Sequence, residues 1–404
     1  MKPRFELENR KIGIIGFNAR PIACSAKRAG AESFVSDYWG DTDLAECCTD
    51  WVAVLTPEPN KRQRGSLEVP VYESLSKNML EVFGENDLDS ILVGSGFDDH
   101  SEYLEPISKK WNIAGNSPEK FRKARTSKEI EAICDDFSIK RPITRDFSSV
   151  EESIDYAREM AYPLLVRKRI SGGGSGIHLV LDETSLIKLV TPRLEKGREL
   201  RLQEYIRGKD ASSSILSTGK EAKILSIQAQ MIGLPAAGRD CDFVYCGNYI
   251  PMVMDEKVRE QITLFSEALC VKLGLLGSNG IDFVVTDDDT VYMMEINPRL
   301  QGTLEMLEIA GNISVIKYHY QALNGILPES LPVFKPIVKL ILYASKNGSV
   351  PDLSSFTNTA DRTPPGVQVF KGDPVCTIFE KGVTLLDCYQ RSFDTAKAIQ
   401  KRIK

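Results

Sequence analysis

Oxygen-bearing side chains recur at close spacing in residues 280–299, a stretch that reads as a β-hairpin closed by an Asp-rich turn. Glu295 and Asn297 are two residues apart, so on a strand their side chains leave the same face. If residues 288–289 form the turn, Asp282 lies directly opposite Glu295 on that face. The spacing therefore predicts a patch of three hard oxygen donors.

Such a patch suits Mg²⁺ or Mn²⁺, because hard divalent cations prefer carboxylate, amide and phosphate oxygens. Arg299 ends the second strand and places a permanent cation beside the patch, where a polyphosphate would need one. We predict that Asp282, Glu295 and Asn297 bind the metal and that Arg299 acts in catalysis. A solvated acidic hairpin is the alternative, and it explains the strand but not the ligands.

A glycine-rich loop separates two predicted strands upstream of this hairpin. The first strand ends in Arg167 and Lys168, and the second covers residues 177–181. Glycine lets backbone amides approach an anion closely, so the loop could close over phosphates as a lid. A helix does not follow the loop, which excludes a Walker A motif and a dinucleotide fingerprint. The loop residues are Ser171, Gly172, Gly173, Gly174, Ser175 and Gly176.

Together, the hairpin, the loop and the segment 202–210 resemble the ATP-grasp superfamily, whose members join a carboxylate to an amine, thiol or related nucleophile through an acyl phosphate. Within that superfamily the chain is most similar to predicted ATP-dependent carboligases related to biotin carboxylase. The supporting motifs are residues 16–21 and 372–377.

The resemblance implies which residues bind ATP. Arg167 falls at the position of a cation that contacts the nucleotide phosphates, Lys168 follows where a proline is frequent, and either cation could make the contact. Lys128 resembles a further nucleotide-contacting lysine. The linker between the two lobes supplies the adenine and ribose contacts, which fall on Glu204, Tyr205, Ile206 and Asp210. In the polar loop 233–248, Arg239 is the cation best placed to meet a substrate carboxylate.

Strands alternate with helices at the beginning of the chain, which predicts a parallel sheet. We therefore expect an α/β protein with a Rossmann-like N-terminal lobe, a two-lobed ATP-grasp module and a small β-rich C-terminal lobe. Asn18, Arg20 and the loop 94–98 follow predicted strands, where ligands gather in open α/β sheets. The expected domains are 1–115, 116–201 for the lid lobe, 202–330 for the large lobe with the metal site, and 331–404.

The implied activity is that of an ATP-dependent carboxylate–amine ligase. The γ-phosphoryl group would pass to a small-molecule carboxylate, and an amine would attack the acyl phosphate, releasing ADP and phosphate. A kinase with a hydroxyl acceptor, a carboxylase-like enzyme with bicarbonate and a non-catalytic ATP sensor are alternatives. An NAD(P)-dependent oxidoreductase is another, because Gly13 and Gly16 followed by Asp37 approximate a ribose-binding pattern, although the triple-glycine spacing is missing.

Composition limits the class of partner. The chain has 404 residues and a net charge of −5. Both signs are interspersed, which argues against nucleic-acid or membrane-surface binding. No apolar run approaches a membrane span, and nine scattered cysteines predict reduced thiols, so we expect a cytoplasmic protein. The expected partners are small-molecule substrates and a second copy of the chain in a homodimer.

Overall fold

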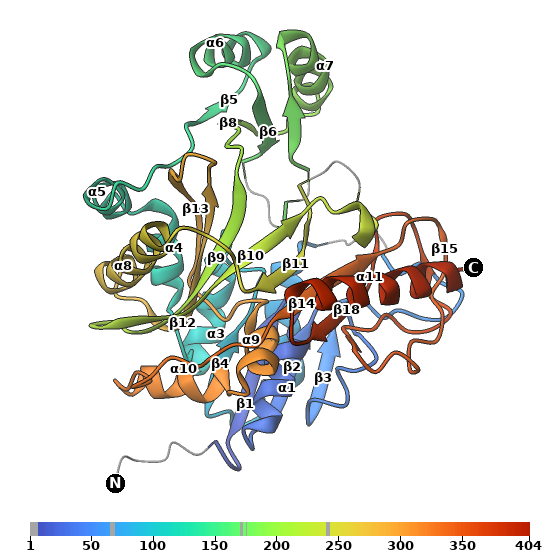
Figure 1. The fold of residues 1–404 in the computed structure, drawn as a ribbon. Coiled ribbons are helices and arrows are strands. Elements are labelled where there is room, and N and C mark those ends of the chain that lie inside the picture. The colour runs from blue at the N-terminus through green and yellow to red at the C-terminus, as the bar shows by residue number, and fades with distance from the viewer. Residues whose placement is uncertain (1–6, 65–68, 170–172, 175, 240–242) are drawn as a thin grey trace.

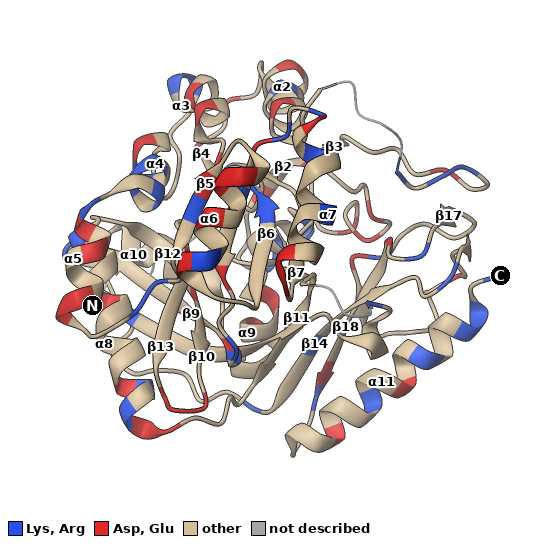
Figure 2. Cartoon of the chain, turned by 90° about the horizontal axis from the view of Figure 1, so that it is seen from above, with Lys and Arg blue, Asp and Glu red and all other residues tan. Residues whose placement is uncertain are grey.

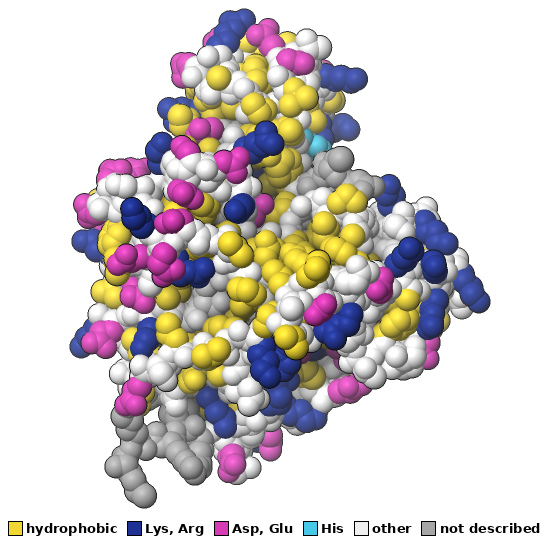
Figure 3. Space-filling view, viewed as in Figure 1, with side chains coloured by type: hydrophobic (Ala, Val, Ile, Leu, Met, Phe, Trp, Pro, Cys, Tyr) yellow, Lys and Arg dark blue, Asp and Glu magenta, His cyan; other side chains and the backbone are white. Residues whose placement is uncertain are grey.

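The computed structural model describes residues 7–64, 69–169, 173–174, 176–239 and 243–404 (Figure 1). A parallel sheet lies at one end, a small antiparallel sheet with two helices lies at the other, and a large antiparallel sheet lies between them. The small lobe projects from the rest of the molecule (Figure 3). This arrangement confirms the predicted α/β class.

The N-terminal lobe is built on a four-stranded parallel sheet in the order β3-β2-β1-β4. Strand β1 is apolar and buried along almost its whole length, because α1 and α2 cover this sheet. The elements are β1 (Lys11–Gly16), α1 (Arg20–Arg28), β2 (Glu32–Asp37), β3 (Asp50–Ala53), α2 (Val71–Phe83), β4 (Ser90–Val93), the 3₁₀ helix η1 (Ser101–Leu104) and α3 (Glu105–Lys110).

Asp37, on which the oxidoreductase alternative depended, has a structural role at the end of β2. Its carboxylate accepts hydrogen bonds from the backbone N–H groups of Ala19 at 2.8 Å, Trp39 at 2.7 Å and Gly40 at 2.9 Å. Both oxygens therefore hold the loops at the strand ends. Because this carboxylate is already used inside the protein, the structure gives the oxidoreductase alternative no support.

The small lobe is a four-stranded antiparallel sheet in the order β5-β8-β6-β7. Helices α6 and α7 cover one face, and their apolar residues form a separate core with the strands. The elements are β5 (Thr144–Phe147), α6 (Val150–Met160), β6 (Leu164–Lys168), β7 (His178–Val180), α7 (Glu183–Leu194) and β8 (Leu200–Glu204).

The large sheet has eight strands in the order β13-β12-β9-β10-β11-β14-β18-β16. Strand β14 pairs with β11, so the C-terminal strands continue this sheet. The elements are β9 (Lys209–Thr218), β10 (Ala222–Ile232), η2 (Pro235–Ala237), β11 (Tyr245–Ile250), α8 (Glu256–Lys272), β12 (Leu276–Val285), β13 (Val291–Asn297), α9 (Leu304–Gly311), α10 (Val315–Leu323), β14 (Ile337–Tyr343), β15 (Gly348–Ser349), β16 (Thr359–Ala360), β17 (Gln368–Val369), β18 (Pro374–Lys381) and α11 (Leu385–Arg402).

Two helices connect the N-terminal and small lobes, namely α4 (Pro118–Thr126) and α5 (Glu129–Asp136). They fall within the predicted lid domain 116–201. Their apolar residues Ala124, Ile130 and Ile133 nevertheless share one core with α8 and the strands of the large sheet. The lid that projects in Figure 1 therefore begins near β5.

One cysteine pair differs from the sequence prediction. Cys24 in α1 and Cys47 are joined by a disulfide, with Cα atoms 4.5 Å apart, whereas the sequence predicted reduced thiols. That prediction is wrong for this pair, because the fold brings together two cysteines whose separation of 23 residues carries no pairing signal. Cys246 is buried, and Cys241 lies outside the described residues.

Acidic and basic residues are mixed along surface helices such as α8 and α11 (Figure 2). None of the helices that the structure describes is both long enough and apolar enough to pass through a membrane.

Candidate active site

The β12–β13 hairpin brings the three predicted oxygen donors together. Asp282 is paired with Glu295 across the two strands. Asn297 Nδ2 donates a hydrogen bond to Asp282 Oδ2 at 3.0 Å, and Gln230 Nε2 donates to Asp282 Oδ1 at 3.0 Å. Burial and the nearby Glu295 charge raise the pKa of Asp282 to about 7. Both side chains are half-buried, and two carboxylates this close favour a shared cation.

The turn of this hairpin is not the predicted one. Thr286 N–H donates to the Thr290 carbonyl, and Asp289 has a left-handed φ of 61°, so the loop has three residues rather than two. That loop alone would place Asp282 opposite Met294. A bulge next to Asp282 shifts the register by one residue and restores the predicted pairing with Glu295.

The described residues contain no group of three or more His, Cys, Asp or Glu side chains that would hold a metal by itself. The hairpin offers two carboxylates and one amide. This set fits Mg²⁺, which usually binds through one or two carboxylates together with substrate phosphates and water. The donor chemistry is therefore compatible with Mg²⁺ carried by a nucleotide.

Two arginines surround the hairpin. Arg299 Nε lies 2.9 Å from both carboxylate oxygens of Asp98, and its Nη2 donates to Asn297 Oδ1 at 3.0 Å. The predicted strand-end loop 94–98 thus reaches the site through Asp98. Arg125, at the end of α4, lies 3.7 Å from Glu295 Oε1 and donates to Asp99 at 2.9 Å. Arg125 was not predicted from the sequence, because it lies far from the hairpin along the chain.

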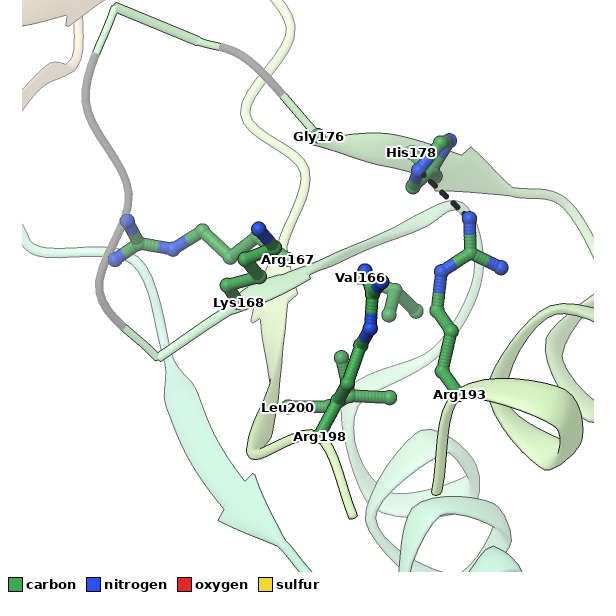
Figure 4. A pocket seen from close by; sticks show the side chains of 8 residues that line it. All are labelled: Val166, Arg167, Lys168, Gly176, His178, Arg193, Arg198 and Leu200. Carbon is green, nitrogen blue, oxygen red and sulfur yellow. Dashed lines mark hydrogen bonds between the residues drawn. The ribbon is translucent and has the colours of Figure 1, made fainter. Parts of the chain in front are cut away.

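Strand β6 separates the two predicted phosphate-binding cations. Burial and Arg201 lower the pKa of Arg167, while Glu295, Asp99 and Asp146 act in the opposite direction, so Arg167 lies within electrostatic reach of Glu295 on the hairpin. Its buried Nε–H donates to no acceptor among the described residues. Lys168 is the next residue on the strand and leaves the opposite face, where it lines another pocket (Figure 4). The geometry therefore favours Arg167 as the phosphate contact.

Part of the glycine-rich loop is described. Gly173, Gly174 and Gly176 have φ angles of 61°, 75° and 77°. Tyr245 N–H donates to the Gly173 carbonyl at 3.3 Å, and a Cβ on Gly174 would lie 1.7 Å from the Phe243 carbonyl oxygen. Glycine is therefore required at position 174 for this close approach. Ser171, Gly172 and Ser175 lie outside the described residues.

The predicted adenine and ribose contacts lie where β8 passes into β9. Glu204 Oε2 accepts the Ile143 N–H at 3.1 Å, which fixes the carboxylate at the edge of the lid sheet. Tyr205 and the half-buried Ile206 form the connection to β9. Burial raises the pKa of Asp210 to about 6. Lys128 is exposed at the start of α5.

Comparison with known proteins identifies one domain of the chain. Residues 128–303 match the family model of the ATP-grasp domain. The chain contains an ATP-grasp domain. That domain includes α5, the small lobe, strands β9 to β13 and the metal-binding candidates.

Two relatives show how far the similarity extends beyond this ATP-grasp domain. The large chain of carbamoyl phosphate synthase from Clostridium perfringens is 22% identical over 254 residues, which is 61% of this chain and 23% of that one. This chain thus matches about a quarter of that relative's length. An uncharacterised protein from Methanocaldococcus jannaschii is 23% identical over 384 residues, covering 92% of this chain and 88% of the other.

Solved structures share the fold of this chain over almost its whole length. The biotin carboxylase domain of Hydrogenobacter thermophilus 2-oxoglutarate carboxylase, in complex with MgADP and bicarbonate, has a TM-score of 0.72 at 13% identity and covers 98% of this chain and 90% of its own. N5-carboxyaminoimidazole synthetase from Staphylococcus aureus, complexed with ADP, has a TM-score of 0.69 at 16% identity. The match covers 97% of this chain and 98% of the synthetase.

Arg239 lies where the ATP-grasp domain meets the C-terminal strands. Its Nη1 donates to the Gly372 carbonyl at 3.2 Å, and its guanidinium lies 5.4 Å from the centre of the Tyr343 ring. Tyr343 in turn donates to the Tyr245 carbonyl at 2.8 Å. These contacts fix Arg239 against the C-terminal lobe, and its role toward a substrate carboxylate stays a prediction.

Arg20 joins three parts of the chain instead of facing an open strand end. The residue is buried at the start of α1, and its Nε lies 2.6 Å from Asp361 Oδ1 and 3.4 Å from Asp43 Oδ2. Both of its terminal nitrogens also contact the Glu305 carboxylate. The N-terminal lobe, α9 of the large lobe and the C-terminal lobe therefore meet at one buried arginine.

His319 is predicted to make the protein less stable in acid. Its Nδ1 accepts the Ser278 N–H at 2.8 Å and its Nε2 lies 2.9 Å from the Ala114 carbonyl oxygen, so the buried ring is neutral. Burial lowers its pKa from 6.5 to about 4. The unfolded chain therefore binds more protons between these values, and the free energy of unfolding falls as the pH falls.

Between pH 7 and pH 4.5 this residue should account for about 2.5 kcal/mol of lost stability. His319→Gln, which has no titrating group, is expected to show a correspondingly smaller fall when urea denaturation is measured at both pH values. An equal pH dependence in the wild type and the variant would contradict the assignment.

Proposed function

We propose that this protein is an ATP-dependent carboxylate–amine ligase. The observation that carries the proposal is the convergence of two half-buried carboxylates, Asp282 and Glu295 of the large sheet, with Arg299 beside them and Arg167 of the small lobe. Acidic groups that share a metal, facing cations that neutralise phosphate, are the combination that phosphoryl transfer requires.

In this proposal Asp282, Glu295 and Asn297 hold Mg²⁺, which would draw charge from the β- and γ-phosphates of ATP. Arg167 neutralises the phosphates from the lid side, and Arg299 stabilises the transferring group. Asp98 and Asn297 orient Arg299 through its Nε and Nη2. Glu204, Tyr205 and Ile206 border the adenine and Asp210 meets the ribose.

The reaction proceeds in two transfers. A carboxylate oxygen of the substrate attacks the γ-phosphorus, and ADP leaves. An amine then attacks the carbonyl carbon, loses a proton and displaces phosphate. The family and the ADP-containing neighbours support ATP as the phosphoryl donor. Bicarbonate is the second candidate acceptor, because one structural neighbour was solved with that anion.

Oxygen labelling tests the proposal. Pairs of carboxylates and amines are incubated with MgATP and screened for ADP, and active pairs are repeated with ¹⁸O in the carboxylate. Transfer of one label to phosphate, together with an amide product, is the expected result. A phosphorylated product without amide would indicate a kinase, and label transfer from bicarbonate would indicate a carboxylase. Amide formation with the label retained would overturn the acyl phosphate.

The opposite orientations of Arg167 and Lys168 give a matched pair of variants. Arg167→Ala is expected to raise the KM for ATP by about tenfold to a hundredfold, because a charged hydrogen bond to phosphate contributes about 1.5–3 kcal/mol. Lys168→Ala should change this KM by less than about threefold, as for an exposed charge. Steady-state assays at varied ATP check both values. Equal effects of the two variants would contradict the orientation.

Two broader features belong to the same proposal. The structural neighbour from H. thermophilus is a dimer, and we propose that this chain is a homodimer in the cytoplasm. Light scattering on the purified protein should give about twice the chain mass of 45.0 kDa.

A further inference from the structure

A second cationic pocket lies in the small lobe, on the side of its sheet that α7 covers. Val166 and Leu200 form its apolar floor, and Lys168, His178, Arg193 and Arg198 line it. Figure 4 shows Arg193, from the end of α7, and Arg198, from the connection between α7 and β8, side by side. Arg167 also borders this pocket. We call it the outer lid pocket.

His178 positions one of the arginines. Arg193 Nη2 lies 3.1 Å from His178 Nε2, and Arg193 Nη1 donates to the Leu189 carbonyl at 2.8 Å. Burial and the Arg193 charge lower the pKa of His178, so the ring is neutral and accepts this hydrogen bond at neutral pH. The Arg193 guanidinium is therefore held at the pocket by a neutral acceptor, so this contact does not neutralise its positive charge.

The positive charge of the outer lid pocket is not balanced within the described part of the chain. Lys168, Arg193 and Arg198 have no carboxylate within ion-pair distance there. Neighbouring arginines of the same lobe form ion pairs with carboxylates. Arg169 Nε lies 3.6 Å from Glu199 Oε2, and Arg201 Nε lies 2.5 Å from Asp146 Oδ1. Three cations around one concave site repel each other unless an anion joins them.

We propose that the outer lid pocket binds a compact phosphate-bearing anion, such as pyrophosphate or a phosphorylated small molecule. Guanidinium groups match phosphate oxygens with paired hydrogen bonds, and Lys168 adds a point charge. The ligand would contact β6 from the face opposite Arg167. It would thereby link this site to the nucleotide side of the same strand. The proposal does not depend on the ligase reaction.

Calorimetric titration with inorganic pyrophosphate tests the proposal. Wild-type protein is expected to bind it, and Arg198→Ala should weaken binding at least about tenfold, as expected for loss of a charged contact. Arg145→Ala is the matched control, because Arg145 is an exposed arginine of the same lobe on β5, outside the pocket. It should change the affinity by less than about twofold. Unfolding midpoints of both variants should equal that of the wild type.

A second titration distinguishes this pocket from the nucleotide site. With a non-hydrolysable ATP analogue at saturation, pyrophosphate should still bind at one site, and that binding should still be weakened in Arg198→Ala. Loss of all pyrophosphate binding under these conditions would overturn the proposal, as would equal affinities of Arg198→Ala and Arg145→Ala. The first titration is informative whether or not the protein binds ATP.

Discussion

Glu295→Gln is expected to reduce Mg²⁺-dependent ADP formation by at least about a hundredfold while the protein remains folded. The change keeps the shape of the side chain and removes one of the two carboxylates that face each other across β12 and β13. The remaining carboxylate and amide would hold Mg²⁺ weakly. Because the variant also removes repulsion between Asp282 and Glu295, its unfolding midpoint should not fall.

Asp289→Asn is the matched control for this variant. It removes the same charge from the same hairpin, but Asp289 is exposed in the loop, and asparagine tolerates its left-handed backbone. ADP release, coupled to a fluorescent readout, is measured at several Mg²⁺ concentrations. Turnover of Glu295→Gln within about twofold of the control would show that the hairpin does not bind the metal.

Arg20→Met should destabilise the protein by about 3–5 kcal/mol, because it leaves buried carboxylates without their cation. Asp43, Glu305 and Asp361 all contact this arginine, and each is largely buried. Methionine fills a similar volume, so the loss would come mainly from uncompensated charge. Chemical denaturation measures the effect as a lower midpoint.

A surface pair provides the comparison. Lys61 lies 2.7 Å from Glu58, and both side chains are more than half exposed. Lys61→Met should therefore cost less than about 1 kcal/mol. Adding Glu305→Gln to Arg20→Met should recover part of the stability, since it removes one unpaired buried charge. Equal losses for the Arg20 and Lys61 variants would mean that the buried cluster does not stabilise the fold.

The geometry of the hairpin was predictable because the residues that determine it lie close together in the sequence. Alternation within a strand puts Glu295 and Asn297 on one face, and the short loop limits the possible partners of Glu295. The predicted pairing of Glu295 with Asp282 was right although the predicted loop was one residue too short. The bulge next to Asp282 shifts the register by one residue and offsets that error. The alternation of strands and helices in the N-terminal lobe was readable for the same reason.

Contacts between distant segments were not predictable. Arg125 reaches the Ile296 carbonyl across 171 residues of sequence, and nothing around Arg125 distinguishes it from an ordinary helical arginine. The Arg20 cluster and the Cys24–Cys47 disulfide likewise join segments that only the packed lobes bring together. The face on which Lys168 lies became clear only from the register of β6 and the position of α7.

The pairing of β14 with β11 has a consequence for shortening the chain. A polypeptide cut after residue 330 would lack β14, whose backbone pairs with residues 247–250 of β11. The cut would leave that strand with unpaired backbone groups and uncover Met231, Ala237 and Cys246, which share a core with Val338 and Leu340 of β14. Such an open edge recruits strands from other molecules. A catalytic fragment made this way should precipitate, whereas the uncut polypeptide should not.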